Sequence, residues 1–282
     1  MYEEAGNSNL LMLLNTAVYP FLVAAIITLI GKFSARLSIL GVAAGFLVAL
    51  SLIHTGLSFP PSKALDFLTI SVILGVTISL VREFKLGVKT RNTISFIGLL
   101  VSFYLLLNPV LQHQSQLLSM AWASISAALV MLMFGLQKST AAPDHSQASM
   151  ASLAIISAAT APVVSIGGSL LIGQLLGGFA ASVVGFVLVQ RFVCKQPSSN
   201  ALLLGSFILA GLLAQAHVLA DLPLSVMLSA YLAVSVNILS NLRIKEDGKV
   251  STTIIALIPQ ILVSGVIAGI SLWSVWPESS LY

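Results

Sequence analysis

Ten long runs of apolar residues limit what this chain can fold into more than any other feature of its sequence. A helix needs about 20 apolar residues to cross a hydrocarbon core about 30 Å thick. Only 8% of the residues are charged and the mean hydropathy is +1.03, whereas a soluble domain carries about 25% charged residues. The alternating ten-residue strands of a membrane β-barrel are absent from the sequence. We therefore predict an all-α, polytopic transmembrane bundle with spans at residues 10–31, 37–57, 65–82, 93–112, 117–136, 148–166, 169–190, 201–220, 222–241 and 252–275.

Two short turns decide whether the count of ten is right. The pair Gly167–Gly168 must divide an apolar stretch of 43 residues into a sixth and a seventh span. The segment Asp221–Pro223 must separate the eighth span from the ninth. Losing either turn would reverse the expected direction of every later helix.

The basic residues follow the expected alternation of loops. The loops after odd-numbered spans contain 12 of the 13 lysines and arginines, and Lys63 is the exception. The positive-inside rule places these loops in the cytoplasm and both termini on the extracytoplasmic side. With the size and compactness of the chain, this predicts an integral protein of a bacterial inner membrane. The basic residues form no clustered face of the kind that binds nucleic acid, so the bilayer is the expected partner.

The stretch GGSLLIGQLLGGFAASVVGF, residues 167–186, raises a choice between phosphate binding and helix packing. A phosphate-binding glycine loop has a GxxxxGK[ST] or GxGxxG pattern, and neither occurs here. Small residues spaced by four instead allow two membrane helices to approach closely. We predict such packing stripes on the seventh and second spans, at Gly173, Gly177, Ala181 and Gly185 and at Gly41, Gly45 and Ala49.

Matching features suggest that the chain is built from two halves. Residues 1–138 and 148–282 would each hold five spans, joined by a polar linker at 139–147. Because five is odd, the two halves would be inverted relative to each other. Inverted repeats are typical of secondary transporters. The alternative is that proline and glycine are simply common in membrane helices.

Polar residues and prolines inside the spans are the candidates for a solute site. Pro20 interrupts the first span and Pro162 the sixth, each with polar neighbours, and the fourth span of each half carries an asparagine. The Asn108–Pro109 pair either frees backbone carbonyls for a solute or marks the frayed end of the fourth span. The predicted substrate-binding residues are Asn15, Thr16, Pro20, Asn108, Thr160, Pro162, Gln174 and Asn237.

Charged and histidine residues give little sign of catalysis or metal binding. No Lys, Arg, Asp or Glu is expected at the membrane midplane, which weighs against a proton pump or a carboxylate-based antiporter. His54, His113 and His217 fall near the outer face with Asp66 and Asp221, without metal-ligand spacing. We interpret them as interfacial residues. We expect no metal, no cofactor and no enzymatic activity.

Two functions remain open at this point. The first is a transporter for a small neutral or weakly polar solute, with its site between the first and sixth spans. The second is a non-catalytic structural subunit of a larger membrane complex, such as a respiratory, antiporter-like or secretion complex. The small-residue stripes would then contact other subunits or a second copy of this chain. In size and helix count the chain is similar to the drug/metabolite exporter superfamily, although the charge pattern gives the opposite orientation of the termini and no motif supports membership.

Overall fold

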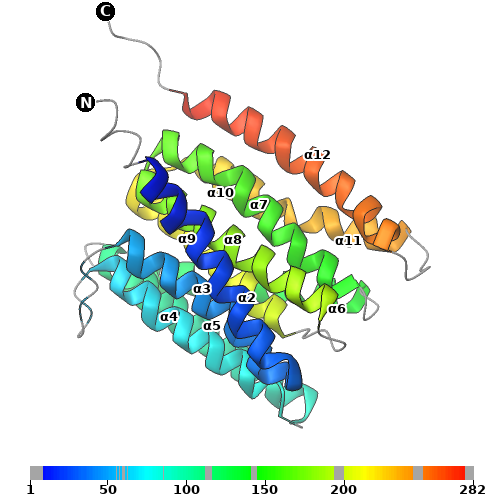
Figure 1. The fold of residues 1–282 in the computed structure, drawn as a ribbon. Coiled ribbons are helices and arrows are strands. Elements are labelled where there is room, and N and C mark those ends of the chain that lie inside the picture. Colours follow the sequence, from blue (N-terminus) through cyan, green and yellow to red (C-terminus); the bar gives the residue numbers. More distant parts are fainter. Residues whose placement is uncertain are drawn as a thin grey trace, which may run out of the picture.

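The protein is all-helical over the residues that the structure describes. The computed structural model describes residues 9–54, 56, 58, 61, 63–84, 86–111, 116–140, 145–193, 200–243 and 250–276, and none of them lies in a strand. The predicted all-α bundle is confirmed (Figure 1). The first helix covers Asn9–Ile30, with a π-helical turn η1 (Leu14–Val18) inside it and α2 (Tyr19–Ile30) after it. The 3-10 turn η2 (Gly31–Phe33) follows, and then α3 (Ala35–Ile53), α4 (Ala64–Val81), α5 (Val88–Leu111), α6 (Gln116–Thr140), α7 (His145–Gly167), α8 (Leu170–Phe192), α9 (Ala201–Ala220), α10 (Leu224–Leu232), α11 (Val234–Arg243) and α12 (Val250–Val275).

Helix length and composition make this an integral membrane protein. Within the described residues, eight helices are long and apolar enough to cross a membrane. Two further apolar segments, Leu37–Ile53 and Leu224–Ile238, are shorter and occupy the predicted second and ninth spans. Ten helical segments therefore follow one another in the predicted order.

Both turns on which the count of ten depends are present. Helix α7 ends at Gly167 and α8 begins at Leu170, where the Ser169 hydroxyl accepts a hydrogen bond of 3.3 Å from the Ile172 backbone amide. Helix α9 ends at Asp221, whose φ of 49° and ψ of 27° are left-handed. The chain reverses at each point, so the two predicted turns are confirmed.

The predicted ninth span at 222–241 is a helical segment with one irregular turn. Ala233 keeps right-handed helical angles (φ −56°, ψ −22°), its amide donates to the Ser229 carbonyl at 3.0 Å, and its carbonyl accepts from the Val236 amide at 3.2 Å. We call this irregular turn the break. Helix α10 ends at Leu232 and α11 begins at Val234, with Ala233 in a turn between them. No proline or glycine lies within Leu224–Arg243, so the sequence gives no local signal for this break. By contrast, Pro259 and Pro162 lie inside helices that continue past them.

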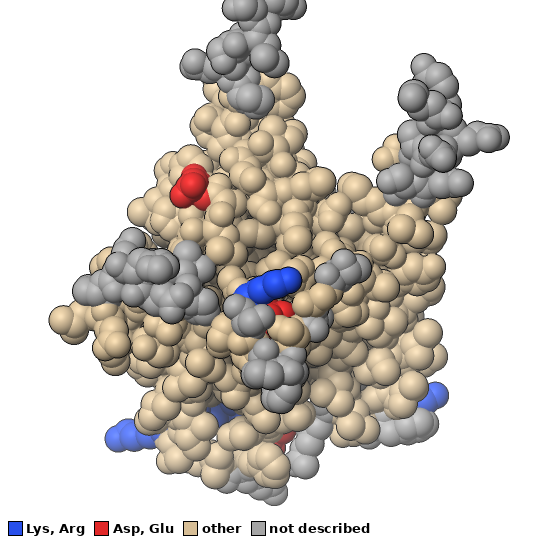
Figure 2. Space-filling view, turned by 90° about the vertical axis from the view of Figure 1, so that its left-hand side faces the viewer, with Lys and Arg blue, Asp and Glu red and all other residues tan. Residues whose placement is uncertain are grey.

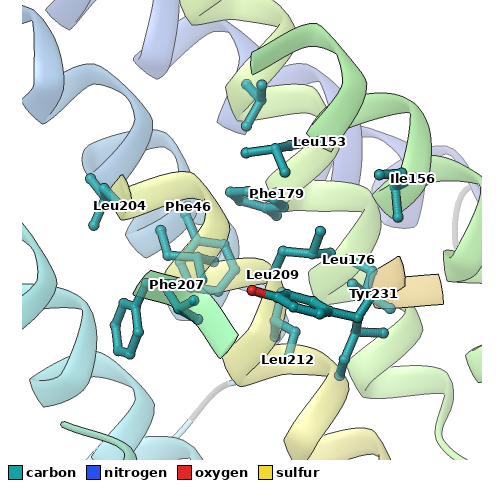
Figure 3. Close-up of a cluster of buried hydrophobic side chains, with 14 of the residues drawn as sticks. Phe46, Leu153, Ile156, Leu176, Phe179, Leu204, Phe207, Leu209, Leu212 and Tyr231 are labelled. Atoms are coloured by element: carbon teal, nitrogen blue, oxygen red, sulfur yellow. The ribbon is translucent and has the colours of Figure 1, made fainter. Parts of the chain in front are cut away.

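Helix α9 lies in the centre of the bundle. It packs against α4, α5 and α6 on one side and against α7, α8 and α10 on the other. Around it, aromatic rings meet edge to face: the Phe103 and Phe207 ring centroids are 5.1 Å apart and those of Phe46 and Phe179 are 6.0 Å apart. Figure 3 shows this core, in which side chains from several helices point toward one another.

The first helix and α12 lie at the periphery. Only 11% of the best membrane window of Asn9–Ile30 and 17% of that of α12 are buried, compared with 78% for α9. Figure 1 shows α12 along the outside of the bundle, next to α7. Their apolar side chains are therefore available to lipid or to another membrane protein.

Hydrogen bonds join several helix ends at one end of the bundle, and this end carries most of the described basic residues. An Arg82–Ser95 bond of 2.7 Å joins the end of α4 to the start of α5, and an Asn200–Glu83 bond of 2.6 Å joins the start of α9 to the same place. We call this the basic end, and it carries Lys32, Arg82, Lys89, Arg91, Lys138 and Arg191. The other end carries Asp66 and Asp221. Figure 2 shows a face on which charged side chains cover only small areas.

The helices that correspond in the two proposed halves pack in pairs. Helix α2 packs against α3, and α7 packs against α8. Helices α3 and α8, the second spans of the two halves, also pack against each other. The inverted repeat itself stays a prediction.

Candidate functional site

The polar residues of the first span lie in its π-helical turn. Asn15 and Thr16 are half-buried in η1, and the Thr16 hydroxyl donates to the Met12 carbonyl at 2.7 Å. Pro20 follows, buried in the first turn of α2. Proline lacks a backbone N–H, and widened π-helical turns occur frequently at functional sites. The turn is therefore a local irregularity of the first span at the predicted place.

The first and sixth spans are not direct neighbours. Helix α8 packs against both α2 and α7, while α2 and α7 share no extensive contact. The Thr160 hydroxyl is buried and donates to the Ile156 carbonyl of its own helix at 2.7 Å. Pro162 is exposed on the surface of α7. The predicted solute contacts of Asn15, Thr16 and Thr160 stay a prediction, and helix order in sequence did not show that α8 would lie between their two spans.

Two other predicted residues stand apart from any polar cluster. Helix α5 continues through Leu111, so Asn108, which is half-buried, lies in its last turns instead of in a frayed segment. Gln174 is half-buried near the start of α8. Neither side chain makes a hydrogen bond to another residue that the structure describes.

Small residues of the second and seventh spans lie where backbones meet. A Cβ added to Gly45 would lie 2.7 Å from the Pro20 carbonyl oxygen, and one added to Gly185 would lie 2.5 Å from the Phe21 carbonyl oxygen. Gly41 faces Thr28 with equal closeness. Only glycine allows α2 to approach α3 and α8 this closely.

Other small residues of α8 pack against two further helices, α7 and α3, instead of against one neighbour. Gly173 faces Ser165 and the Ala161 carbonyl of α7. A Cβ added to Gly177 would meet nothing within 4 Å, whereas one added to Gly178 would lie 2.6 Å from the Ala49 methyl. Ala181 is half-buried on the same helix and Ala49 is fully buried. Gly177 is thus not a point of close packing, and the sequence prediction missed Gly178 because the four-residue spacing passes over it.

The break in the ninth span is held by a side chain from another helix. The Gln260 side-chain amide of α12 donates to the Ala233 carbonyl at 3.1 Å and to the Ser264 hydroxyl at 2.8 Å. Gln260 is fully buried. The Ala233 carbonyl also accepts from the Val236 backbone amide at 3.2 Å, so Gln260 adds a hydrogen bond to a carbonyl that is already paired.

Asn237 lies one helical turn beyond Ala233 and faces the sixth span. Its side-chain amide donates to the Ser149 hydroxyl of α7 at 2.8 Å, and the residue is fully buried. Residues four apart share a helix face. Asn237 and the Gln260-bound carbonyl of Ala233 therefore lie on the same side of the ninth span.

Three buried oxygens around the break have no hydrogen-bond partner among the described residues. They are Asn237 Oδ1, Gln260 Oε1 and the Tyr231 hydroxyl. Leaving such a group unpaired costs about 1–3 kcal/mol. Native structures retain unpaired polar atoms mainly at sites that bind water, an ion or a ligand.

Tyr231 also lines a small pocket. The pocket lies between α6, α9 and α10 and is otherwise mostly apolar, with Ser126 as its other hydroxyl. Figure 3 shows the tyrosine oxygen reaching into the apolar cluster of the core. Tyr231 and Gln260 were not predicted as site residues, because their place beside a break becomes visible only once the break is known.

The end opposite the basic end is built from helix caps, not from a metal site. Asp66 is buried and accepts hydrogen bonds from the Ser58 hydroxyl at 2.8 Å and the Lys63 backbone amide at 2.9 Å. His217 Nδ1 lies 2.7 Å from the Leu222 carbonyl oxygen. The Nε2 atom of His54 is buried and has no partner in the part of the chain that the structure describes, and Asp221 is exposed. His113 lies outside the described residues, and no metal-binding group of three is found among those described.

Comparison with known proteins yields no relative from which a function could be carried over. No protein-family model matches the chain. A search of curated proteins finds no significant match. The function must therefore be argued from the arrangement of residues alone.

Proposed function

We propose that this chain is a membrane transporter for a small neutral or weakly polar solute. The observation that supports the proposal is the irregular turn at Ala233, near which three buried oxygens, on Tyr231, Asn237 and Gln260, lack a partner among the described residues. Discontinuous membrane helices commonly form the solute sites of secondary transporters. Irregular backbone at membrane depth is tolerated where protein buries it or where it lines a cavity.

The chemistry of these groups favours a solute with N–H or O–H donors. Asn237 and Gln260 offer amide oxygens and Tyr231 offers a hydroxyl. Within the described candidate spans, the charged residues lie in the first or last turns of their helices. They are Asp66 of α4, Lys89 and Arg91 of α5, Lys138 of α6 and Arg191 of α8. A solute of this class would need no buried counter-charge. We therefore propose movement without coupling through a membrane carboxylate.

The proposed site retains one residue of the predicted site, Asn237, and is centred on the ninth span. The hydroxyls of Thr16 and Thr160 bond to carbonyls of their own helices. Asn237 and Gln260 instead connect three helices, α7, α11 and α12, at the break. We infer that the ninth span, and not the first and sixth together, provides the solute contacts.

An osmotic assay tests the proposal. The full chain is reconstituted into liposomes, and re-swelling is followed by light scattering with glycerol, urea and erythritol as probes. We expect at least one probe to enter faster than into protein-free liposomes. Asn237→Ala should slow that entry by about tenfold, the equivalent of one lost hydrogen bond of about 1.4 kcal/mol.

Ser149→Ala is the matched control. It removes the partner of the Asn237 amide and leaves the unpaired Oδ1 in place. We expect its entry rate to stay within about twofold of the unsubstituted chain. The proposed site fails if both variants match the unsubstituted protein. The transporter function fails if no probe enters faster than without protein.

A structural role in a larger complex is supported by a different observation, on α12. Gly265 and Gly269 are four residues apart and exposed, and a Cβ added to either meets nothing within 4 Å. Exposed small residues at this spacing are typical of contacts between membrane helices. The function would then be to hold partner subunits beside α12.

Purification in a mild detergent tests this second function. Partner proteins should appear in fixed ratio with the unsubstituted chain and be lost from Gly265→Leu. Gly135→Leu is the control, because Gly135 of α6 is also exposed with open space around it. A chain that purifies alone contradicts the structural role.

A further inference from the structure

Three cationic side chains from three helices meet at the basic end. Arg82 follows the last turn of α4, Arg91 lies in the first turn of α5, and Lys138 lies near the end of α6. The Arg82 guanidinium carbon is 4.7 Å from the centroid of the Phe134 ring, and Lys138 Nζ is 5.9 Å from the same centroid. We call Arg82, Arg91 and Lys138 the cationic cluster.

The members of the cationic cluster act on one another electrostatically. Burial and then the positive charge of Arg91 lower the pKa of Arg82 to about 10. Arg82 and Arg91 both lie within electrostatic reach of Lys138. Positive charges held this close repel each other unless an anion lies among them.

The protein leaves hydrogen-bond donors of the cluster unused. Arg82 is 5% exposed, and its terminal nitrogens donate to the Ser95 hydroxyl at 2.7 Å and to Asn92 Oδ1 at 3.4 Å. Its Nε is buried with no partner among the described residues, and the same holds for the Nε of Arg91. A buried donor on a charged group is expensive to leave unpaired.

The nearest described acid does not neutralise the cluster. Glu83 lies within electrostatic reach of Lys138, but its Oε1 accepts a hydrogen bond of 2.6 Å from Asn200. No described acid forms an ion pair with any of the three cations. Within the described part of the chain, three positive charges therefore stand against the single carboxylate of Glu83, and an excess of positive charge remains.

We propose that the cationic cluster binds a phosphate group. Arginine presents a planar fork of donors that matches the oxygens of phosphate, and lysine adds a point charge. The same chemistry is offered by the headgroup of an anionic phospholipid and by a soluble phosphate. Basic pockets between membrane helices are known to take lipid headgroups.

The surface beside the cluster favours the lipid as the source of the phosphate. Ile94, Ile97 and Val101 of α5 are exposed and follow Arg91 along the helix. A phosphate held by Arg91 would leave the attached acyl chains beside this apolar stripe. A soluble phosphate would gain nothing from it.

Binding to the purified full chain in detergent tests the proposal. The probes are dioleoylphosphatidylglycerol, dioleoylphosphatidylcholine and sodium phosphate, with lipid occupancy read by native mass spectrometry and phosphate binding by calorimetry. We expect the anionic lipid to bind at least about tenfold more tightly than the zwitterionic one, as for one added charged hydrogen bond. Arg91→Gln and Lys138→Gln should each remove about tenfold of that affinity.

Arg191→Gln is the matched control. Arg191 lies at the same end, on α8, where its guanidinium donates to Gln147 Oε1 at 3.5 Å. Its loss should change the affinity by less than about twofold. Lys138→Gln decides the result if Arg91→Gln fails to fold, because Lys138 is exposed.

The outcomes distinguish a lipid headgroup from a soluble phosphate, and both from the absence of a phosphate site. Anionic lipid binding that depends on Arg91 and Lys138 identifies a headgroup. Binding of sodium phosphate alone with the same dependence identifies a soluble phosphate. Equal binding of both lipids without phosphate binding, or an equal loss in Arg191→Gln, overturns the proposal.

Discussion

The Gln260 side chain of α12 donates a hydrogen bond of 3.1 Å to the backbone carbonyl of Ala233, at the point where the ninth span is broken. The same carbonyl also accepts from the Val236 backbone amide at 3.2 Å, so the Gln260 side chain adds a second hydrogen bond at this irregular turn. Its amide also reaches the Ser264 hydroxyl at 2.8 Å. The irregular turn at Ala233 is therefore bonded directly to α12.

Gln260→Leu should destabilise the protein. The substitution removes two buried side-chain hydrogen bonds, to the Ala233 carbonyl and to the Ser264 hydroxyl, which together cost about 1–3 kcal/mol of the free energy of unfolding. Thermal unfolding in detergent measures the loss. Gln174→Leu is the control, since Gln174 makes no hydrogen bond to a described residue, and its cost should stay under about 0.5 kcal/mol. Equal stability of the two variants would refute the role given to Gln260.

Gly185→Ala should destabilise the contact between α8 and α2. The new methyl would lie 2.5 Å from the Phe21 carbonyl oxygen, a backbone atom that can move only with its helix. Overpacking of this kind costs about 1–3 kcal/mol. Gly177→Ala on the same helix meets nothing within 4 Å and should leave the unfolding temperature unchanged. A larger loss in Gly177→Ala than in Gly185→Ala would contradict the packing.

Tyr231→Phe should leave the fold as stable as before or raise its stability by about 1 kcal/mol. The substitution removes a buried hydroxyl that has no described partner and keeps the ring. Thermal unfolding gives the stability, and solute entry into liposomes shows whether the hydroxyl contacts the solute. A clear fall in stability would mean that the hydroxyl is satisfied, for instance by bound water.

Asp66→Asn should weaken the start of α4. The carboxylate accepts hydrogen bonds from Ser58 and from the Lys63 backbone amide, and a loss of such a cap costs about 0.5–2 kcal/mol. Asp221→Asn should be nearly neutral, because Asp221 is exposed and asparagine tolerates its left-handed conformation. The unfolding temperatures of the two variants, measured under the same conditions, test this difference. An equal shift in both would show that Asp66 does not act as a cap.

The positions of the spans could be predicted because the bilayer sets their length and polarity. The turns at Gly167–Gly168 and Asp221–Pro223 also carry local signals, since glycine and proline end helices. The irregular turn at Ala233 has no such local signal. The Gln260 amide that bonds to its carbonyl lies 27 residues away in the sequence. Local sequence cannot show such a partner.

The predicted site could not be located for a related reason. In lipid, an apolar helix face is equally stable against a neighbouring helix or an acyl chain, so hydrophobicity does not reveal which helices are neighbours. Pro20 and Pro162 look equivalent in sequence, yet Pro20 is buried against other helices and Pro162 is exposed. Asn237 was predicted as a site residue, and its contact with Ser149 became evident only from the packing of α11 on α7.

The central position of α9 restricts how the molecule could move during the proposed transport. If the parts before and after residues 139–147 rocked as rigid bodies, α9 would slide against α4, α5 and α6, with which it packs. Phe207 of α9 lies edge-on to Phe103 there, at 5.1 Å, and sliding would separate these rings. A hinge at Ala233 would instead let α11 and α12 swing while α9 stays fixed, at the cost of their contacts with α7, including the Asn237–Ser149 hydrogen bond. The moving element would then be the second half of the ninth span with the tenth span, and α9 with its other neighbours would form the static frame.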